Sequence, residues 1–228
     1  MPEVDYELYK LITVSGTDAH EFLQGQLTQD IGRLAGSGGL LAAWCNAKGR
    51  VVVIIHLVEF NDGIGLIVPA TMAERVIQRL NMYRLRSKVE IGAPDDQWID
   101  HIDTDLADPA ALIRAGIPTI DESNTESYTP HMLNLDKLDA ISFSKGCYTG
   151  QEVVARTEHL GQSKRRMMRY EADQESVAVG ARLSNGERDV GTVVNVVGRD
   201  LLAVTPVELH EQSLTIDGIS VTPRGLPY

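Results

Sequence analysis

The last third of the chain consists of short β-like runs separated by turn residues, and this pattern restricts the fold more than any other feature. The runs cover residues 167–170, 190–197, 201–205 and 214–221, with turn pairs such as Asn185-Gly186 and Asp217-Gly218 between or within them. Strands this short, at this spacing, are typical of a small antiparallel barrel or sandwich. We therefore expect a C-terminal β-barrel domain over residues 161–228.

Residues 1–160 combine two hydrophobic periods, one helical and one strand-like. Strand-like runs cover residues 40–44, 50–60, 64–68 and 89–91. Helix starts are indicated by Asp18 with Glu21, by Thr71 with Glu74, and by Asp108 with Pro109. The predicted fold class is therefore α+β, in which a mixed or antiparallel sheet and its helices form a first domain over residues 1–160.

Composition narrows the classes of function. The net charge is −11, and such a surface repels phosphate backbones, so we expect no direct nucleic-acid binding, sequence-specific or otherwise. The longest apolar run, residues 51–58, is too short to span a bilayer, and residues 1–10 show no secretory signal, so a cytoplasmic protein is expected. The histidines lack metal-ligand spacing and the two cysteines form no disulfide framework, so no resident metal site is predicted.

One segment, residues 144–156 with the sequence SKGCYTGQEVVAR, is the strongest candidate for chemistry. Thr149 and Glu152 have capping-box spacing, which predicts that a helix starts just after Thr149. Cys147 then precedes the helix start and Lys145 lies two residues before it, and both the helix dipole and the ammonium favour a thiolate. We therefore predict Cys147 and Lys145 as catalytic residues, although a lone cysteine is also common as a small core residue.

The run KGCYTGQE closely resembles the signature of the YgfZ family, relatives of the aminomethyltransferase (T protein) of the glycine cleavage system. Further blocks resemble that family in the same order, namely residues 14–30, 46–50, 83–89, 115–118 and 134–143. The resemblance spans most of residues 10–170. It implies a folate-binding α+β portion of the T-protein type, followed by a small antiparallel β-barrel.

In functional terms, the resemblance implies a tetrahydrofolate-binding accessory protein that supports iron–sulfur cluster assembly or repair and, indirectly, tRNA modification. The implied cofactor is tetrahydrofolate or a one-carbon derivative, and the implied partners are iron–sulfur proteins or cluster assembly factors. The hallmark cysteine of the family corresponds to Cys147. Two alternatives stay open: a folate-dependent one-carbon transferase acting on an unknown acceptor, and a non-enzymatic module that docks a partner.

The sequence departs from the T-protein pattern in two places. T-protein enzymes carry an aspartate for aminomethyl transfer shortly after a glycine turn, where this chain has Val52 and Val53. Typical family members also have additional chain where this sequence has only the acidic stretch 92–114. The first departure argues against glycine cleavage, and the second bears on the depth of the folate pocket.

Folate-binding residues are predicted from the motif blocks and their chemistry. Arg84, Arg86 and Lys88 alternate along an expected strand and would share one face, and a folate needs donors around an apolar slot. Asp30 could accept hydrogen bonds from a pterin or simply end a helix, and the ring of Tyr148 could stack on a ligand. The full predicted set is Asp30, Arg84, Arg86, Tyr148, Gln151, Glu152 and Arg156.

Other residues have two interpretations each. A basic cluster after the motif could hold the glutamate tail of a folate or lie on a solvated strand. Its members are Lys164, Arg165, Arg166 and Arg169. Trp44 could stack on a ligand or belong to the core, and Cys45 is interpreted as structural. His131 and His159 flank the motif, and either could serve as a base for Cys147.

Overall fold

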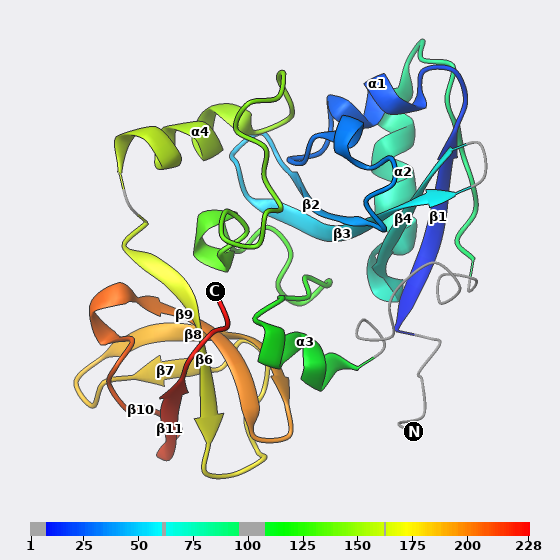
Figure 1. Cartoon of the computed structure of the whole chain (residues 1–228). Coiled ribbons are helices and arrows are strands. Elements are labelled where there is room, and N and C mark those ends of the chain that lie inside the picture. Colours follow the sequence, from blue (N-terminus) through cyan, green and yellow to red (C-terminus); the bar gives the residue numbers. More distant parts are fainter. Residues whose placement is uncertain (1–7, 61–62, 96–107, 162) are drawn as a thin grey trace.

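The structure of the protein is a computed structural model that describes residues 8–60, 63–95, 108–161 and 163–228. It has the predicted α+β fold, with a five-stranded sheet in the first part of the chain and a closed barrel in the last part (Figure 1). None of the helices within these ranges is long and apolar enough to cross a membrane.

The five-stranded sheet is antiparallel throughout and has the order β2-β3-β4-β1-β5. Its strands are β1 (Tyr9–Ser15), β2 (Leu40–Cys45), β3 (Val51–Phe60), β4 (Gly63–Pro69) and β5 (Glu90–Ile91). Four of them coincide with the strand-like runs of the sequence, whereas β1 is recognised only from its pairing with β4 and β5. Residues 61 and 62, between β3 and β4, lie outside the described residues.

The barrel closes in the order β10-β11-β6-β9-β8-β7, which confirms the antiparallel barrel expected from the turn spacing. Its strands are β6 (Arg165–Ala172), β7 (Arg182–Ser184), β8 (Asp189–Val197), β9 (Asp200–Pro206), β10 (Leu214–Ile216) and β11 (Ile219–Arg224). The run 214–221 forms two strands because Asp217 and Gly218, with φ of 49° and 83°, make a two-residue hairpin turn.

Helices α1 (Ala19–Gln24) and α2 (Ala73–Arg84) cover one face of the sheet. They bury Phe22, Leu23, Val76 and Leu80 in a core that also contains Trp44 of β2. The side chains recur at three- to four-residue intervals, as expected of a helix packed on a sheet. This face is therefore closed to ligands except at its edge.

Between the sheet and the barrel the chain forms α3 (Pro109–Ala115), an irregular segment with a 3-10 turn at His131–Leu133, and α4 (Gln151–Leu160). Helix α3 has the predicted start, where Asp108 accepts a hydrogen bond from the Ala110 amide (2.9 Å), and Gly116 ends the helix with a φ of 70°. Most of the acidic stretch 92–114, namely residues 96–107, lies outside the described residues.

Helices α1, α2 and α4 begin within two residues of the predicted starts, but the predicted side-chain caps are wrong, because no side chain caps any of the three. Helix α2 follows a 3-10 turn, Ala70–Met72, so Thr71 is not at its N-cap. Gly150 takes the N-cap position of α4 with a φ of 83°, so Thr149 and Glu152 form no capping box. A left-handed glycine can lead the chain into a helix without a capping side chain.

The sheet and the barrel share one hydrophobic core. Ala43 and Ile54, on the face of the sheet opposite to α1 and α2, belong to the same buried cluster as Met167, Val194 and Leu202 of the barrel. The helix α4 ends and the barrel begins at about the expected boundary, but a division into independent domains at residue 160 stays a prediction. The shared core places the loop before α4 next to the end of β2.

Candidate functional site

The cysteine of the KGCYTGQE run lies in the loop that leads into α4. Cys147 is exposed, whereas Cys45, at the end of β2, is buried. Burial raises the pKa of the Cys45 thiol to about 12. Cys147 is therefore the thiol that a reagent or partner in solution can reach.

Two glycines bring this loop against the turn that joins β2 to β3. At Gly150 a Cβ atom would lie 2.4 Å from the carbonyl oxygen of Asn46, and at Gly49 it would lie 2.7 Å from the Cβ of Val153. Both glycines also have positive φ, 83° and 68°. The two sequence motifs, NAKGR and KGCYTGQE, therefore pack on each other at a distance that only glycine allows.

The ammonium group of Lys145 is directed at the backbone of a neighbouring loop. Its Nζ donates to the carbonyl oxygens of Leu27 (2.7 Å) and Gln29 (2.8 Å), and it lies 5.3 Å from the ring centroid of Tyr148. Burial lowers the pKa of Lys145 to about 8, although the negative charge of Asp30 acts in the opposite direction. Two of the three N–H donors of this group are thus already used.

The structure contradicts the predicted strand of cationic residues. Arg84 is the last residue of α2, and Arg86 and Lys88 lie in the turn that follows it. The alternation of charges comes from a helix end and a turn, where a period of two has no structural meaning. Arg84 donates to the carbonyl of Val89 (3.3 Å), and Asp18 accepts a hydrogen bond from the Lys88 amide (2.7 Å).

Asp30 and Tyr148 have structural roles. Asp30 caps the 3-10 helix Ile31–Arg33 by accepting a hydrogen bond from the Gly32 amide (3.1 Å). This agrees with the second interpretation of Asp30, that of a residue at a helix end. Tyr148 is buried, and burial, followed by the neighbouring Cys45, raises the pKa of its phenol. Its ring is therefore part of the support of the loop.

The predicted folate-binding residues on α4 also make contacts within the protein. Glu152 pairs with Arg156 one turn later (2.6 Å), and both side chains are largely exposed. Gln151 donates to the Gly146 carbonyl (3.4 Å), which holds the loop before the helix. Gln151 thus supports the cysteine loop, and the role of all three residues in folate binding stays a prediction.

A groove opens beside the 46–50 turn, formed by two adjoining hollows of about 230 and 570 Å³. Both hollows are lined by Asn46, Ala47 and Glu126. The smaller one is also lined by Trp44, Cys45, Arg79, Met82 and Tyr83. The larger one is also lined by Lys48, Arg50 and Ser127. We call these residues together the Glu126 groove.

Glu126 is the acidic centre of this groove. Its Oε1 accepts hydrogen bonds from Arg79 (2.7 Å) and Arg75 (3.1 Å), and its Oε2 accepts one from Asn46 (3.1 Å). Burial raises the pKa of Glu126, but the hydrogen bonds from Arg79 and Asn46 and the charges of both arginines outweigh it and hold the pKa below its usual value. A carboxylate has about four acceptor positions, and the hydrogen bonds from other described residues use three of them.

The groove also offers aromatic and cationic surface. Trp44 and Tyr83 meet edge to face, with 6.1 Å between their ring centroids. Trp44 is buried and belongs to the core, whereas Tyr83 is 47% exposed. Lys48, which is exposed, and Arg50 add positive charge at the open end. An anionic ligand with a flat ring would find complementary groups at both ends.

None of the seven predicted folate-binding residues, all of which the structure describes, lines this groove. Sequence reasoning missed Glu126, Arg75 and Arg79, because Glu126 lies in an irregular segment and the arginines look like ordinary helix surface. The signals in the sequence were the 46–50 and 83–89 blocks of the family resemblance, which contain Asn46 and Tyr83, and the choice of Trp44 as a possible stacking residue. A third cavity of about 320 Å³, between the start of β1, α3 and β8, is mostly apolar and contains none of the predicted site residues.

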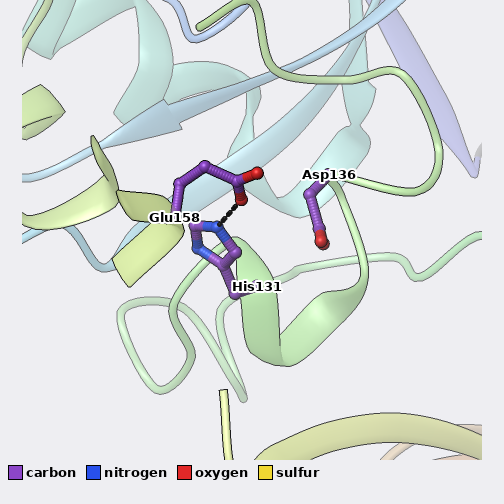
Figure 2. Close-up of side chains that lie close together, drawn as sticks. All are labelled: His131, Asp136 and Glu158. Carbon is purple, nitrogen blue, oxygen red and sulfur yellow. Dashed lines mark hydrogen bonds and ion pairs between the residues drawn. The ribbon is translucent and has the colours of Figure 1, made fainter. Parts of the chain in front are cut away.

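Three side chains that can ligate metal ions come together although their spacing in the sequence predicts no metal site. His131 Nε2 lies 3.0 Å from Glu158 Oε2, and Asp136 lies beside them, with all three ligand atoms within 4.8 Å of one another (Figure 2). Arg166 binds both oxygens of Asp136 (2.9 and 2.8 Å). Because its positive charge would repel a metal ion here, we interpret the trio as an ion-pair network that pairs His131 with Glu158 rather than with Cys147.

The basic cluster after the motif is occupied by contacts within the protein. Arg165 donates to a backbone carbonyl of β8 (2.7 Å), Arg166 is paired with Asp136, and Arg169 is paired with Asp200 (2.8 Å). These arginines therefore stabilise the barrel and its contact with the preceding segment.

The positions that correspond to the aspartate of the T-protein enzymes, Val52 and Val53, are buried in this chain. Trp44 pairs with Val53 and Cys45 pairs with Val51, so Val52 is the extra residue of a β-bulge. Val52 and Val53 both belong to the core beneath α1 and α2, with exposed fractions of 1% and 0%. This place therefore presents apolar side chains only.

The sheet, the barrel and the loop between them define a protein of the T-protein fold class. The glycine cleavage system aminomethyltransferase T of Bartonella henselae matches with a TM-score of 0.72 over 98% of this chain and 84% of that one, at 15% sequence identity. At this identity the likeness shows the fold alone.

Sequence relatives then give the family, although no family model matches the chain. The tRNA-modifying protein YgfZ of Escherichia fergusonii is 31% identical in an alignment of 221 positions that covers 69% of this chain and 68% of that protein. An uncharacterized protein of Haemophilus influenzae is 31% identical in an alignment of 232 positions that covers 84% of this chain and 83% of that one. The chain belongs to the YgfZ family.

Proposed function

We propose that this protein binds tetrahydrofolate, or a one-carbon derivative of it, in the Glu126 groove. A pterin ring presents N–H groups to a carboxylate, and the glutamate tail presents carboxylates to cations. The observation that carries the proposal is a Glu126 carboxylate kept ionised by Arg79 and Arg75, in a groove with Tyr83 at one end and cations at the other. The T-protein fold of the chain supports it.

We further propose that folate binding serves iron–sulfur cluster assembly or repair in the cytoplasm, with Cys147 as the functional residue and an indirect effect on tRNA modification. The support is the exposure of Cys147 in the hallmark motif and the name of the Escherichia fergusonii relative, a tRNA-modifying protein. The net charge of −11 favours an indirect link to tRNA.

A one-carbon transferase is the second candidate, because the fold is that of an aminomethyltransferase. The burial of Val52 and Val53 weighs against it, since an apolar bulge supplies no acid for the transfer. A transferase would turn folate over when an acceptor is supplied, whereas a binding protein would return it unchanged. A broad screen of acceptors without turnover therefore favours the accessory role.

The folate proposal is tested by calorimetric titration with 5-formyltetrahydrofolate under reducing conditions. We expect binding in the micromolar range, about −8 kcal/mol. The substitution Glu126→Gln removes the charge-assisted hydrogen bond and should weaken binding by about tenfold or more. Glu122→Gln removes an exposed carboxylate outside the groove and is the matched control. Equal affinity in all three proteins would reject this groove as the site, and absence of binding would reject the ligand.

The role of Cys147 is tested by complementation of a strain in which a cluster-dependent enzyme fails without its own YgfZ protein. Cys147→Ser should abolish complementation while folate binding is kept. Cys45→Ala, which removes the buried thiol, is the control for loss of a cysteine. Full complementation by Cys147→Ser would contradict the proposed role, and partner capture that survives in this variant would favour the docking alternative.

A further inference from the structure

The loop that carries Cys147 rests on a second loop, residues 25–30, which we call the seat. The Ser142 amide donates to the carbonyl of Thr28 (2.9 Å), and the Thr149 amide donates to the carbonyl of Gly25 (3.3 Å). These two hydrogen bonds hold the cysteine loop at both ends. The residues between them depend on other contacts for their position.

The seat itself is fixed to the sheet. Thr28 and Ala43 exchange two hydrogen bonds, from the Thr28 amide to the Ala43 carbonyl (2.9 Å) and from the Ala43 amide to the Thr28 hydroxyl (2.8 Å). The Thr28 hydroxyl also donates to the carbonyl of Ala140 (2.7 Å). Thr28 and Gln29 are fully buried. A loop with its polar groups satisfied in this way is a rigid support.

Lys145, between the two ends of the cysteine loop, connects the middle of this loop to the seat. Its ammonium donates to the carbonyls of Leu27 and Gln29 on the seat, at 2.7 and 2.8 Å, over a separation of more than one hundred residues in the chain. The carbonyls are acceptors without charge, so the ammonium acts through directed hydrogen bonds. Among the described residues, the charged or titratable groups that act on it are Asp30, through its negative charge, and Tyr148, whose ring centroid lies 5.3 Å away.

We propose that Lys145 is a positioning residue, which clamps the cysteine loop to the seat and thereby sets the position of the Cys147 thiol. The competing interpretation, suggested by the two-residue separation of Lys145 and Cys147 in the sequence, is a direct electrostatic role in which the ammonium stabilises the thiolate. The geometry favours the clamp, because two donors of the ammonium are already bound to carbonyls. Burial of the ammonium, which lowers the pKa of Lys145 to about 8, is unfavourable, and the two hydrogen bonds to the seat offset part of this cost.

This inference rests on the proposed role of Cys147 but not on folate binding. Its test therefore uses thiol chemistry and loop protection, neither of which needs a ligand. If the folate titration shows no binding, the proposal for Lys145 still stands. If the experiment on Lys145 contradicts the clamp, the folate proposal still stands.

The experiment compares the native protein with Lys145→Met, Lys145→Arg and the control Lys137→Met, in which an exposed lysine of the preceding segment is replaced. Two quantities are measured in each protein. The first is hydrogen–deuterium exchange of the amides of residues 142–150. The second is the rate of Cys147 alkylation by iodoacetamide as a function of pH, which gives a midpoint pH.

The clamp predicts that exchange in residues 142–150 becomes about tenfold faster in Lys145→Met, because hydrogen bonds to a charged donor are lost. Lys145→Arg keeps the charge but not the geometry of two donors on one nitrogen, so it should loosen the loop as well. The alkylation midpoint should stay unchanged in every variant. Lys137→Met should behave like the native protein.

The direct electrostatic role predicts a different result. Loss of a nearby positive charge would raise the alkylation midpoint of Lys145→Met by about one pH unit, and Lys145→Arg would restore it. Such a shift overturns the clamp whatever the exchange rates are. Unchanged exchange in both Lys145 variants also overturns it, and Lys145→Arg alone decides the question if Lys145→Met does not fold.

Discussion

Cys147 and Cys45 differ in one physical property, the burial of the sulfur, and this difference predicts their reactivity. Cys147 is exposed, whereas burial raises the pKa of Cys45 to about 12. At a pH near 8, Cys45 then carries about one thiolate per ten thousand molecules and is also shielded from reagents.

We therefore expect one rapidly alkylated thiol per native chain, detected by intact-mass spectrometry after treatment with iodoacetamide. Cys147→Ser should remove it, and Cys45 should react only after unfolding in denaturant. Rapid labelling of two thiols in the native protein would contradict the burial of Cys45.

Lys145 predicts a dependence of stability on pH. Its pKa falls from 10.5 to about 8 on folding, chiefly through burial, so the unfolded chain binds more protons between these two values. Stability should therefore rise with pH through this window, by less than the full shift of the pKa would give, because the partly buried ammonium is screened by solvent.

Urea denaturation at several pH values measures this effect as the difference between the native protein and Lys145→Met. Taking the difference removes the contributions of tyrosines and other lysines that titrate in the same range. A difference in unfolding free energy that stays constant or falls with rising pH would contradict the burial of the ammonium.

At the scale of elements, the contact between the cysteine loop and the 46–50 turn depends on Gly150. A Cβ at Gly150 would meet the Asn46 carbonyl at 2.4 Å, whereas a Cβ at Gly180, which has the same φ of 83°, would meet nothing within 4 Å. Gly180→Ala should cost about 1 kcal/mol through its left-handed backbone alone. Gly150→Ala should cost about 3 kcal/mol, because the clash is added to the backbone term.

The two variants are compared by denaturant unfolding, and Cys147 alkylation reports on the loop. Gly150→Ala should also change the alkylation rate, whereas Gly180→Ala should not. Equal costs for the two substitutions would mean that the motifs do not pack on each other as closely as described.

The ion-pair network around Arg166 connects the barrel to the segment before α4. The side chains of Arg166 and Asp136 are 18% and 14% exposed, so Asp136→Asn leaves a largely buried charge without its partner. We expect a loss of about 3 kcal/mol. Glu158→Gln keeps a hydrogen-bond partner for His131 on an exposed side chain and should cost less than about 1 kcal/mol.

Thermal unfolding monitored by circular dichroism measures both losses. Added zinc should stabilise neither Asp136→Asn nor Glu158→Gln more than it stabilises the native protein, because the Arg166 guanidinium repels a cation. A stoichiometric zinc complex of the native protein would contradict the interpretation of the trio as a purely structural network.

At the scale of the whole molecule, the sheet and the barrel depend on a common core. Met167, Val194, Leu202 and Val204 of the barrel are buried together with residues of β2 and β3. Exposing four such side chains costs roughly 6 kcal/mol or more, which is comparable with the total stability of a small domain.

We therefore expect a single calorimetric unfolding transition for the full chain, and we expect residues 161–228 expressed alone to lack a stable fold. Coexpression with residues 1–160 should rescue the barrel fragment. Two separate transitions in the full chain would show instead that the division at residue 160 separates independent domains.

The sequence by itself determined the features that are encoded within a few neighbouring residues. The barrel follows from short β-like runs and from turns such as Asp217-Gly218, and helix α3 follows from its cap and its terminal glycine. The KGCYTGQE run indicates the family and places Cys147 before a helix. The strand predicted through Arg84 and Arg86 failed because a charge alternation on the surface carries no packing information.

Only the tertiary structure decided which of these residues meet. The Lys145 ammonium binds carbonyls 118 and 116 positions away, and Glu126 meets Arg79 across 47 positions. Local periodicity and turn chemistry act over one or two turns of chain, whereas such contacts exist only after the sheet and barrel have buried their shared core. The position of the thiol and the charge of the groove therefore became visible only in the folded molecule.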